Sequence, residues 1–213
     1  LSALSIAALP ALAETKDFPV GSFSSIDVKG GIKVLYETGA ETTVIVEQAE
    51  GDFSDISIET DDGELQIGRE SLGFLKSLRA NLHVDLVELD ASSSAKLIVS
   101  GRAASADMDA SSSSSIDASD FIVGAITIEA TSSADVIAHA VTNSRARIDA
   151  SSSSDVKLVL ESTADIDVDA SSSTDIVLTG TCDEITVDAS SSADVEAKDL
   201  LCKSAEIEAS SSA

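Results

Sequence analysis

The sequence contains no tryptophan, and aromatic residues make up only 3% of its 213 residues. Its hydrophobic residues, 43% of the chain, are mainly Ala, Val, Ile and Leu, which suit a core of thin layers. Basic residues are also scarce, because 13 Lys and Arg stand against 38 Asp and Glu and leave a net charge of −25. Phosphate recognition needs clustered Lys and Arg, so this balance argues against a nucleic-acid partner. It equally disfavours docking on an anionic membrane surface.

Motifs of the common enzyme classes are missing as well. The chain has no phosphate-binding loop, dinucleotide fingerprint or metal-type His/Cys cluster. Its two histidines, His83 and His139, lie in alternating apolar segments, and we expect both to be solvated surface residues. The enzymatic alternative that stays open is a carbohydrate-active β-helix, which would use an acidic cluster. Such a site normally has long loops and basic or aromatic sugar contacts, and Tyr and Trp are nearly absent here.

A seven-residue phrase, Asp/Glu-Ala-Ser/Thr-Ser-Ser-x-x, recurs with steps of 19 or 20 residues. Its acidic residues are Asp90, Asp109, Glu129, Asp149, Asp169, Asp188 and Glu208. So constant a period predicts stacked, equivalent coils. A flexible Ser-rich linker would not keep aliphatic positions in phase, and the motifs of leucine-rich repeats and calcium-binding nonapeptides are absent. The sequence therefore predicts an all-β, right-handed parallel β-helix with about 20 residues per coil.

Apolar residues keep a fixed position relative to each repeated acid. They occur one residue before it (from Leu89 to Ile207), three before it (from Val87 to Ala205) and seven after it (from Leu97 to Val195). Strand alternation places them on one face and the acids on the other. The same count places a serine of each phrase on the inner face, where we expect a ladder of hydroxyl groups. These serines are Ser93, Ser112, Ser132, Ser152, Ser172, Ser191 and Ser211.

Residues 18–88 lack the phrase but also read as β-structure. Alternating segments at 26–28, 32–34, 44–46, 56–58 and 65–67 are separated by turn signals such as Asp61-Asp62-Gly63. Only residues 70–79 are compatible with a short helical turn. We therefore expect one domain over residues 14–213, with irregular β coils at 18–88 and regular repeats at 87–213.

The first 13 residues are apolar and uncharged and end in Ala11-Leu12-Ala13. This pattern is typical of the hydrophobic region and cleavage site of a secretory signal peptide. A membrane anchor would need about 20 apolar residues, so we expect no transmembrane segment in the mature chain. We expect an exported protein of the periplasm, outer-membrane surface or extracellular space. At the other end the chain stops inside a seventh copy of the phrase, as if the repeat continued.

The chain resembles a known family. The residues Phe23-x-x-Ile26-x-Val28-x-Gly30-Gly31-Ile32-x-Val34, then Asp62-Gly63-Glu64-Leu65-x-Ile67, then the repeated acid-small-Ser segments are similar to the putative auto-transporter adhesin, head GIN domain. The resemblance covers residues 18–213 and rests on the order of these motifs. It implies a β-helical, exported bacterial domain named as an adhesin, with no catalytic residues to transfer. We therefore expect a non-enzymatic binding or adhesion module whose surface ligand is a protein or a glycan. Relatives often have glycine in the repeat turn, where this chain has serine.

The acidic residues form two expected columns, because a second set, Asp135, Asp155, Asp175 and Asp194, follows the serine tracts. One interpretation is a solubilising acidic face, and another is direct contact with a cationic partner. A third is calcium binding, since calcium prefers carboxylate and other oxygen ligands. The residues predicted for calcium are Asp149, Asp155, Asp169, Asp175, Asp188 and Asp194. Apart from calcium, no cofactor is expected.

The two cysteines, Cys182 and Cys202, are 20 residues apart and occupy the same position in adjacent coils. Their Cα atoms are then expected about 4.8 Å apart, which a disulfide tolerates. Export to an oxidising compartment would let the bond form. The alternative is a stacked pair of reduced cysteines that pack as small hydrophobic residues.

Overall fold

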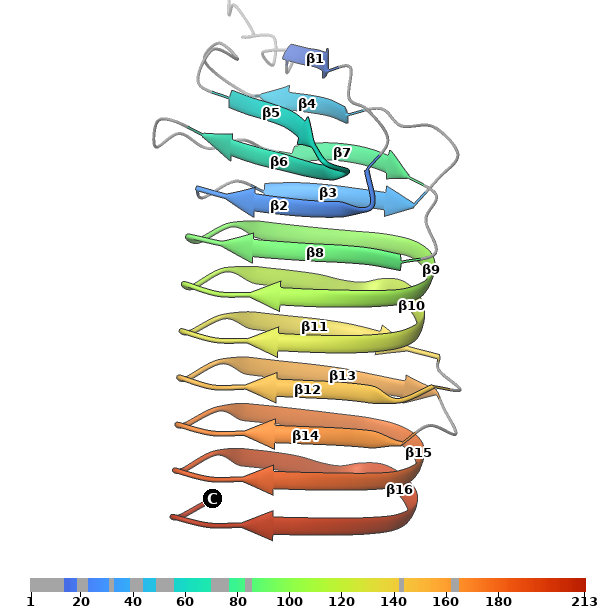
Figure 1. Ribbon diagram of the computed structural model, residues 1–213, viewed down its shortest axis with the longest axis vertical. Coiled ribbons are helices and arrows are strands. Elements are labelled where there is room, and N and C mark those ends of the chain that lie inside the picture. The colour runs from blue at the N-terminus through green and yellow to red at the C-terminus, as the bar shows by residue number, and fades with distance from the viewer. Residues whose placement is uncertain are drawn as a thin grey trace, which may run out of the picture.

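The computed structural model describes residues 14–18, 23–30, 33–38, 44–48, 56–69, 77–82, 86–141, 144–161 and 165–213. Within these ranges the chain forms a flattened β-solenoid of about six turns, with about 20 residues per coil and no helix (Figure 1). No helix that could cross a bilayer occurs in the described part of the chain. The expected signal peptide, residues 1–13, lies outside the described residues.

The described residues of the irregular N-terminal part contain seven strands. They are β1 (Glu14–Phe18), β2 (Ser25–Lys29), β3 (Lys33–Thr38), β4 (Val44–Gln48), β5 (Ile56–Asp61), β6 (Glu64–Arg69) and β7 (Ser77–Leu82). The pairs β1–β4, β4–β7 and β5–β6 are antiparallel, whereas β2 and β3 pair in parallel with the first regular coil. The β5–β6 hairpin turns at Asp62-Gly63, where both residues have positive φ. The expected helical turn is wrong over 77–79, which belong to β7, and residues 70–76 lie outside the described ranges.

Nine strands build the regular coils. They are β8 (Leu86–Ser92), β9 (Lys96–Ala110), β10 (Ser115–Ala130), β11 (Asp135–Ala140), β12 (Ala146–Ala150), β13 (Asp155–Glu161), β14 (Ile166–Ala170), β15 (Asp175–Ala189) and β16 (Asp194–Ala209). All neighbouring pairs among them are parallel, and most keep the register that the repeat predicts. The register shifts within the pairs β9–β10, β10–β11 and β15–β16. The four long strands bend and contribute to both layers, so all sixteen strands join in one continuous sheet.

Figure 1 shows two layers, which we call the front sheet and the rear sheet. The front sheet contains β8, β12, β14 and the C-terminal halves of β9, β10, β15 and β16. The rear sheet contains β11, β13 and the N-terminal halves of the same four strands. Front strands run to the left and rear strands to the right as the chain descends, which makes the solenoid right-handed, as predicted.

The inner faces of the two sheets form the core, and strand alternation explains its composition. The apolar positions predicted from the repeat are buried from Val87 to Val187. They fail at the last coil, where Ile207 is 66% exposed, because no described strand covers its inner face. Close stacking also restricts one residue in β15. Gly180 has φ +113°, and a Cβ there would lie 1.8 Å from the carbonyl oxygen of Leu160 in the coil before.

The expected inward serine ladder is wrong. Every serine in that set is exposed, and each adopts a positive φ together with the serine that follows it. Two successive left-handed residues form a tight turn, closed for example by Ser114 N–H donating to Ser111 O at 3.2 Å. The two-residue alternation does not hold within the turn, so parity assigns the first serine to the wrong face, although it is correct again beyond the turn, as at Leu97. The serines thus adopt the left-handed backbone conformation that glycine usually occupies.

Stacking of these turns offsets their strained backbone. The amide of the second serine donates to the carbonyl of the first serine in the next coil, as from Ser153 N to Ser172 O at 3.1 Å. The inward positions belong to the residue after each serine pair, and hydroxyl groups occur there. Ser114 Oγ donates to Ala91 O at 2.7 Å, and Ser154 Oγ donates to Ala130 O at 2.9 Å. These two buried hydroxyls therefore bond the backbone of the preceding coil instead of each other, whereas Thr174 Oγ1, buried at the same position, has no hydrogen-bond partner.

Candidate functional site

The strongest functional feature in the structure is a column of carboxylates on the front sheet. The registers pair Asp90 with Asp109, Asp109 with Glu129, and so on through Asp149, Asp169 and Asp188 to Glu208. Adjacent strands lie about 4.8 Å apart, so each like-charge contact costs about 0.9 kcal/mol in bulk water and more near a protein surface. The column therefore carries a concentrated negative potential along the whole front sheet.

Sequence reasoning missed one member of this column. Asp27 of β2 pairs with Asp90 and is only 9% exposed. It lies outside the repeated phrase, so no periodicity points to it, although its alternation with Ile26 and Val28 does. The Lys29 ammonium donates a hydrogen bond to Asp27 Oδ2. This bond raises the pKa of Lys29 above its ordinary value, and the charges of Asp27, Glu64 and Asp90 add to the effect.

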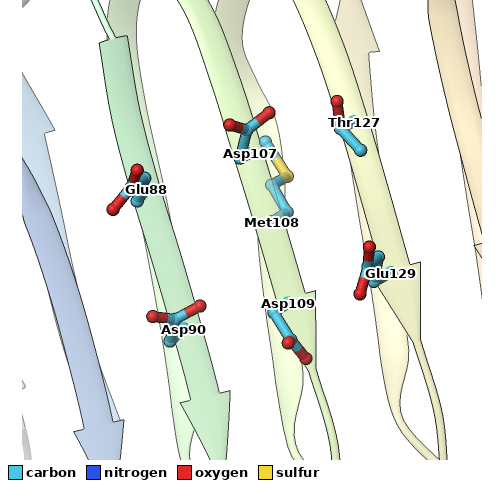
Figure 2. A pocket seen from close by; sticks show the side chains of 7 residues that line it. All are labelled: Glu88, Asp90, Asp107, Met108, Asp109, Thr127 and Glu129. Carbon is cyan, nitrogen blue, oxygen red and sulfur yellow. The ribbon is translucent and has the colours of Figure 1, made fainter.

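An acidic hollow of about 310 Å³ lies at the N-terminal end of the column. Figure 2 shows its lining on three neighbouring strands, with Glu88 and Asp90 on β8, Asp107, Met108 and Asp109 on β9, and Thr127 and Glu129 on β10. The side chains form two rows, one of Glu88, Asp107 and Thr127 and one of Asp90, Asp109 and Glu129. The first row follows from strand alternation, since its residues lie two before each repeated acid.

Asp90 is the most perturbed carboxyl of this hollow. Partial burial raises the pKa of Asp90 from 3.8 to about 6, with the negative charges of Asp109, Asp27, Glu64 and Glu88 contributing in that order after burial. A carboxyl of this kind stays protonated to a higher pH than an ordinary aspartate. It can therefore donate a hydrogen bond or accept a cation, depending on pH.

Basic side chains neutralise the front sheet in part, further along the column. Arg147 lies in the outer row beside the acids, and its Nη2 is 3.5 Å from Asp169 Oδ2. Arg145 Nη1 is 3.1 Å from Asp167 Oδ2. Both arginines are more than half exposed, so these ion pairs contribute little stability, typically under about 1 kcal/mol each. They nevertheless distinguish this stretch from the hollow around Asp90, whose lining residues include no base.

The second predicted column lies on the rear sheet. Asp135 pairs with Asp155, Asp155 with Asp175, and Asp175 with Asp194. Partial burial raises the pKa of Asp155 above its ordinary value, the charges of Asp135 and Asp175 raise it further, and Lys157 lowers it. A hollow of about 190 Å³ lies here, lined by Asp135, Val136, Ile137, Asp155 and Lys157.

The structure separates the six aspartates predicted to bind calcium into two groups. Asp149, Asp169 and Asp188 are in register on the outer face of the front sheet, and Asp155, Asp175 and Asp194 are in register on the outer face of the rear sheet. Among the described residues, no three His, Cys, Asp or Glu side chains gather closely enough to hold a metal ion. The calcium site stays a prediction, with each column as a separate ligand set.

The histidines and cysteines complete the set of predicted residues. His139 is not a fully solvated residue, because its side chain is 25% exposed and its Nε2 lies 3.7 Å from Glu161 Oε1. His83 lies outside the described residues. Cys182 and Cys202 are paired in register between β15 and β16, with Cα atoms 4.5 Å apart, and form a disulfide. The bond links the last two coils.

Comparison with known proteins identifies the family. Residues 22–79, 75–158 and 137–213 each match the family described as putative auto-transporter adhesin, head GIN domain. The chain belongs to this family. The resemblance stated from the ordered motifs is therefore confirmed, and it extends over both the irregular strands and the regular coils. No curated protein matches the chain.

Two solved structures are similar over almost their entire length. A putative adhesin from Bacteroides fragilis NCTC 9343 has a TM-score of 0.51 and 12% identity, covering 93% of this chain and 95% of that one. A putative adhesin from Parabacteroides merdae ATCC 43184 has a TM-score of 0.52 and 14% identity, covering 92% of this chain and 96% of that one. At these identities the similarity shows a shared fold and transfers no binding residue.

Proposed function

We propose that this chain is a non-enzymatic, exported binding or adhesion module of the bacterial cell envelope. The observation that carries the proposal is the match of three overlapping stretches to the adhesin head family. The fold supports it, because stacked coils give a rigid body with two long, regular outer faces. Repeated faces of this kind suit an extended surface ligand, either a protein or a glycan.

The alternative is a carbohydrate-active β-helix, and one observation favours it. Glycosidases need a carboxyl group of raised pKa close to an ionised carboxylate. The front-sheet hollow places Asp90, whose pKa is raised to about 6, in register with Asp109. The adhesion proposal interprets the same hollow as part of a binding surface and requires no turnover there.

The test combines binding and hydrolysis on the purified chain. We expect saturable binding to at least one immobilised glycan or extracellular-matrix protein, measured by surface plasmon resonance, with no release of reducing sugar. Release of sugar by the native chain that Asp90→Asn abolishes would establish the enzymatic alternative. Cell fractionation of the producing bacterium tests export separately.

A further inference from the structure

Exposed apolar side chains concentrate at one place on the rear sheet. Among the described residues, the exposed large hydrophobic side chains are Ile137 (38%), Val141 (42%), Val159 (42%), Leu201 (74%) and Ile207 (66%). The last two belong to β16, the final strand. Ile137 lies in β11, Val141 directly follows β11, and Val159 lies in the adjacent strand β13, in the middle of the solenoid.

The registers place these three residues in adjoining outward rows, interspersed with polar side chains. One outward row runs from Asp117 through Ile137 and Lys157 to Val177. In the next outward row Ile122 pairs with His139, and His139 pairs with Val159. Two further apolar residues of these rows, Ile122 and Val177, are half-buried, and His139 and Lys157 lie between the apolar residues in register. We call the following set the rear patch: Ile122, Ile137, Val141, Val159 and Val177.

The rear patch has an acidic border on one side. Asp135, Asp155 and Asp175 occupy the outward position two residues before Ile137, Lys157 and Val177. These three carboxylates are in register and exposed, and partial burial together with their mutual repulsion raises the pKa of Asp155. The border and the adjoining row, from Asp135 to Val177, are fully described by the structure. Lys157 is the one base among their six residues. The border therefore keeps an excess of negative charge directly beside apolar surface.

The front sheet lacks this combination in its described outward rows. They carry the acidic column and, two residues earlier, polar or charged residues in each coil from Glu88 to Glu206. Both outer faces thus have an in-register column of carboxylates. In the described outward row next to each column, exposed Ile and Val occur only on the rear face. Alternation requires apolar residues inside and does not require any outside. Alternation therefore does not account for the exposed Ile and Val of the rear patch.

Charge decides which occupant fits the rear patch. A second copy of this chain carries −25 and would bring the same aspartate column against this one, which like-charge repulsion opposes. A partner with Lys or Arg beside apolar residues would pair its charges with the three border aspartates and cover Ile137 and Val159. Burial of the apolar side chains would then add to affinity, while the carboxylates would steer the encounter.

We propose that the rear sheet over β10, β11, β13 and β15 docks a cationic, amphipathic protein segment through the rear patch and its aspartate border. This inference rests on the proposed binding function and names the face and the chemistry of the partner. It differs from electrostatic attraction to the acidic protein as a whole, because it requires both the apolar residues and one of the two acidic columns.

The probe is a synthetic peptide of alternating lysine and leucine, and the control probe replaces every leucine with serine. Binding is measured by fluorescence anisotropy at physiological ionic strength with the whole chain. We expect the lysine–leucine peptide to bind at least tenfold more tightly, which corresponds to about 1.4 kcal/mol. Equal affinity of the two peptides would overturn the proposal, since charge alone would then explain binding.

Matched variants test the face. The rear triple variant removes three negative charges from the border: Asp135→Asn, Asp155→Asn and Asp175→Asn. The front triple variant removes three from the other column: Asp149→Asn, Asp169→Asn and Asp188→Asn. Because the border contacts the peptide directly, we expect the rear variant to lose roughly tenfold or more in affinity and the front variant less than threefold. Equal losses would refute the assignment to the rear sheet.

A polar substitution of the patch provides an independent readout. Ile137→Ser with Val159→Ser should abolish the preference for leucine over serine in the probe, while Leu201→Ser in the last coil should leave it unchanged. All three side chains are exposed, so circular dichroism and melting temperature should stay close to those of the native chain. An unchanged preference in the folded double variant would overturn the proposal.

The outcomes separate this proposal from the proposed function. In one outcome, a surface ligand found by plasmon resonance binds the rear triple variant and the native chain with equal affinity. If the peptide also shows no preference for the rear patch, the adhesion function stands and the rear docking surface is refuted. If no surface ligand is found but the peptide maps to the rear patch, the docking surface stands and the adhesion function loses its support.

Discussion

Asp90 offers the sharpest test of how the structure distributes charge. This carboxyl is half-buried and lies between Asp27 and Asp109 in register. The charged groups that act on it are Asp109, Asp27, Glu64 and Glu88, with Lys29 paired to Asp27. We expect the isosteric, neutral substitution Asp90→Asn to stabilise the protein near neutral pH, because it removes a partly desolvated charge that is surrounded by others of the same sign.

The magnitude follows from the pKa of Asp90. One pKa unit corresponds to about 1.36 kcal/mol, so a rise from 3.8 to about 6 corresponds to at most about 3 kcal/mol. The side chain is partly exposed, and solvent screening reduces this value to about 1–2 kcal/mol. Because the folded-state pKa is raised, the protonated carboxyl favours folding. Its contribution is fully present below about pH 4 and is lost as the pH rises through about 6.

The assay is the melting temperature of the native chain and Asp90→Asn between pH 4 and pH 7.5. For a chain of this size, 1 kcal/mol changes the melting temperature by about 2–4 °C, so we expect an increase of roughly 2–8 °C at pH 7.5. The increase should vanish near pH 4, where the native carboxyl is protonated. Asp149→Asn removes the same charge from an exposed position of the column and should give a smaller effect. A pH-independent effect of Asp90→Asn would refute the reasoning.

Three further predictions concern backbone, disulfide and metal. Gly180→Ala should lower the free energy of unfolding by at least about 2 kcal/mol, because the position has a positive φ and the new Cβ would clash with Leu160 O. In the same chemical denaturation assay, Gly68→Ala should cause a smaller loss, because nothing lies within 4 Å of its Cβ position. Denatured, unreduced protein purified from the periplasm should show no free thiol, and two titratable thiols would disprove the disulfide. Cys202→Ser should speed amide hydrogen exchange in β16 without affecting β10. Millimolar calcium should raise the melting temperature beyond sodium chloride of equal ionic strength, because it relieves repulsion along the aspartate columns; equal increases would leave a solvated acidic face.

The regular coils were predictable from sequence because their period is almost invariant. Residues 20 apart stack, so Asp149 and Asp169 or Cys182 and Cys202 become neighbours without any knowledge of the turn between them. The alternation within each strand then assigns Ile148 to the core and Asp149 to the surface, as observed. The acidic columns follow from the same two rules.

Other features depend on local geometry that alternation does not contain. The serine pairs adopt left-handed conformations, so the parity count through Ser152 and Ser153 assigned an exposed hydroxyl to the core. The antiparallel pairing of β4 with β7 joins segments of no common motif. The position of Asp27 beside Asp90 depends on how the irregular strands stack onto the first coil, and no sequence period encodes that contact.

The acidic outer rows also explain how an apolar rear patch can stay exposed. Regular parallel sheets with bare faces and an open end risk association with copies of themselves. A column of carboxylates on each face opposes such association, because any two copies that approach face to face bring like charges together. Ile137 and Val159 are thereby kept from a second copy of the chain but open to a partner of positive charge. Repulsion between the carboxylate columns of two copies is thus the physical condition for a selective apolar surface.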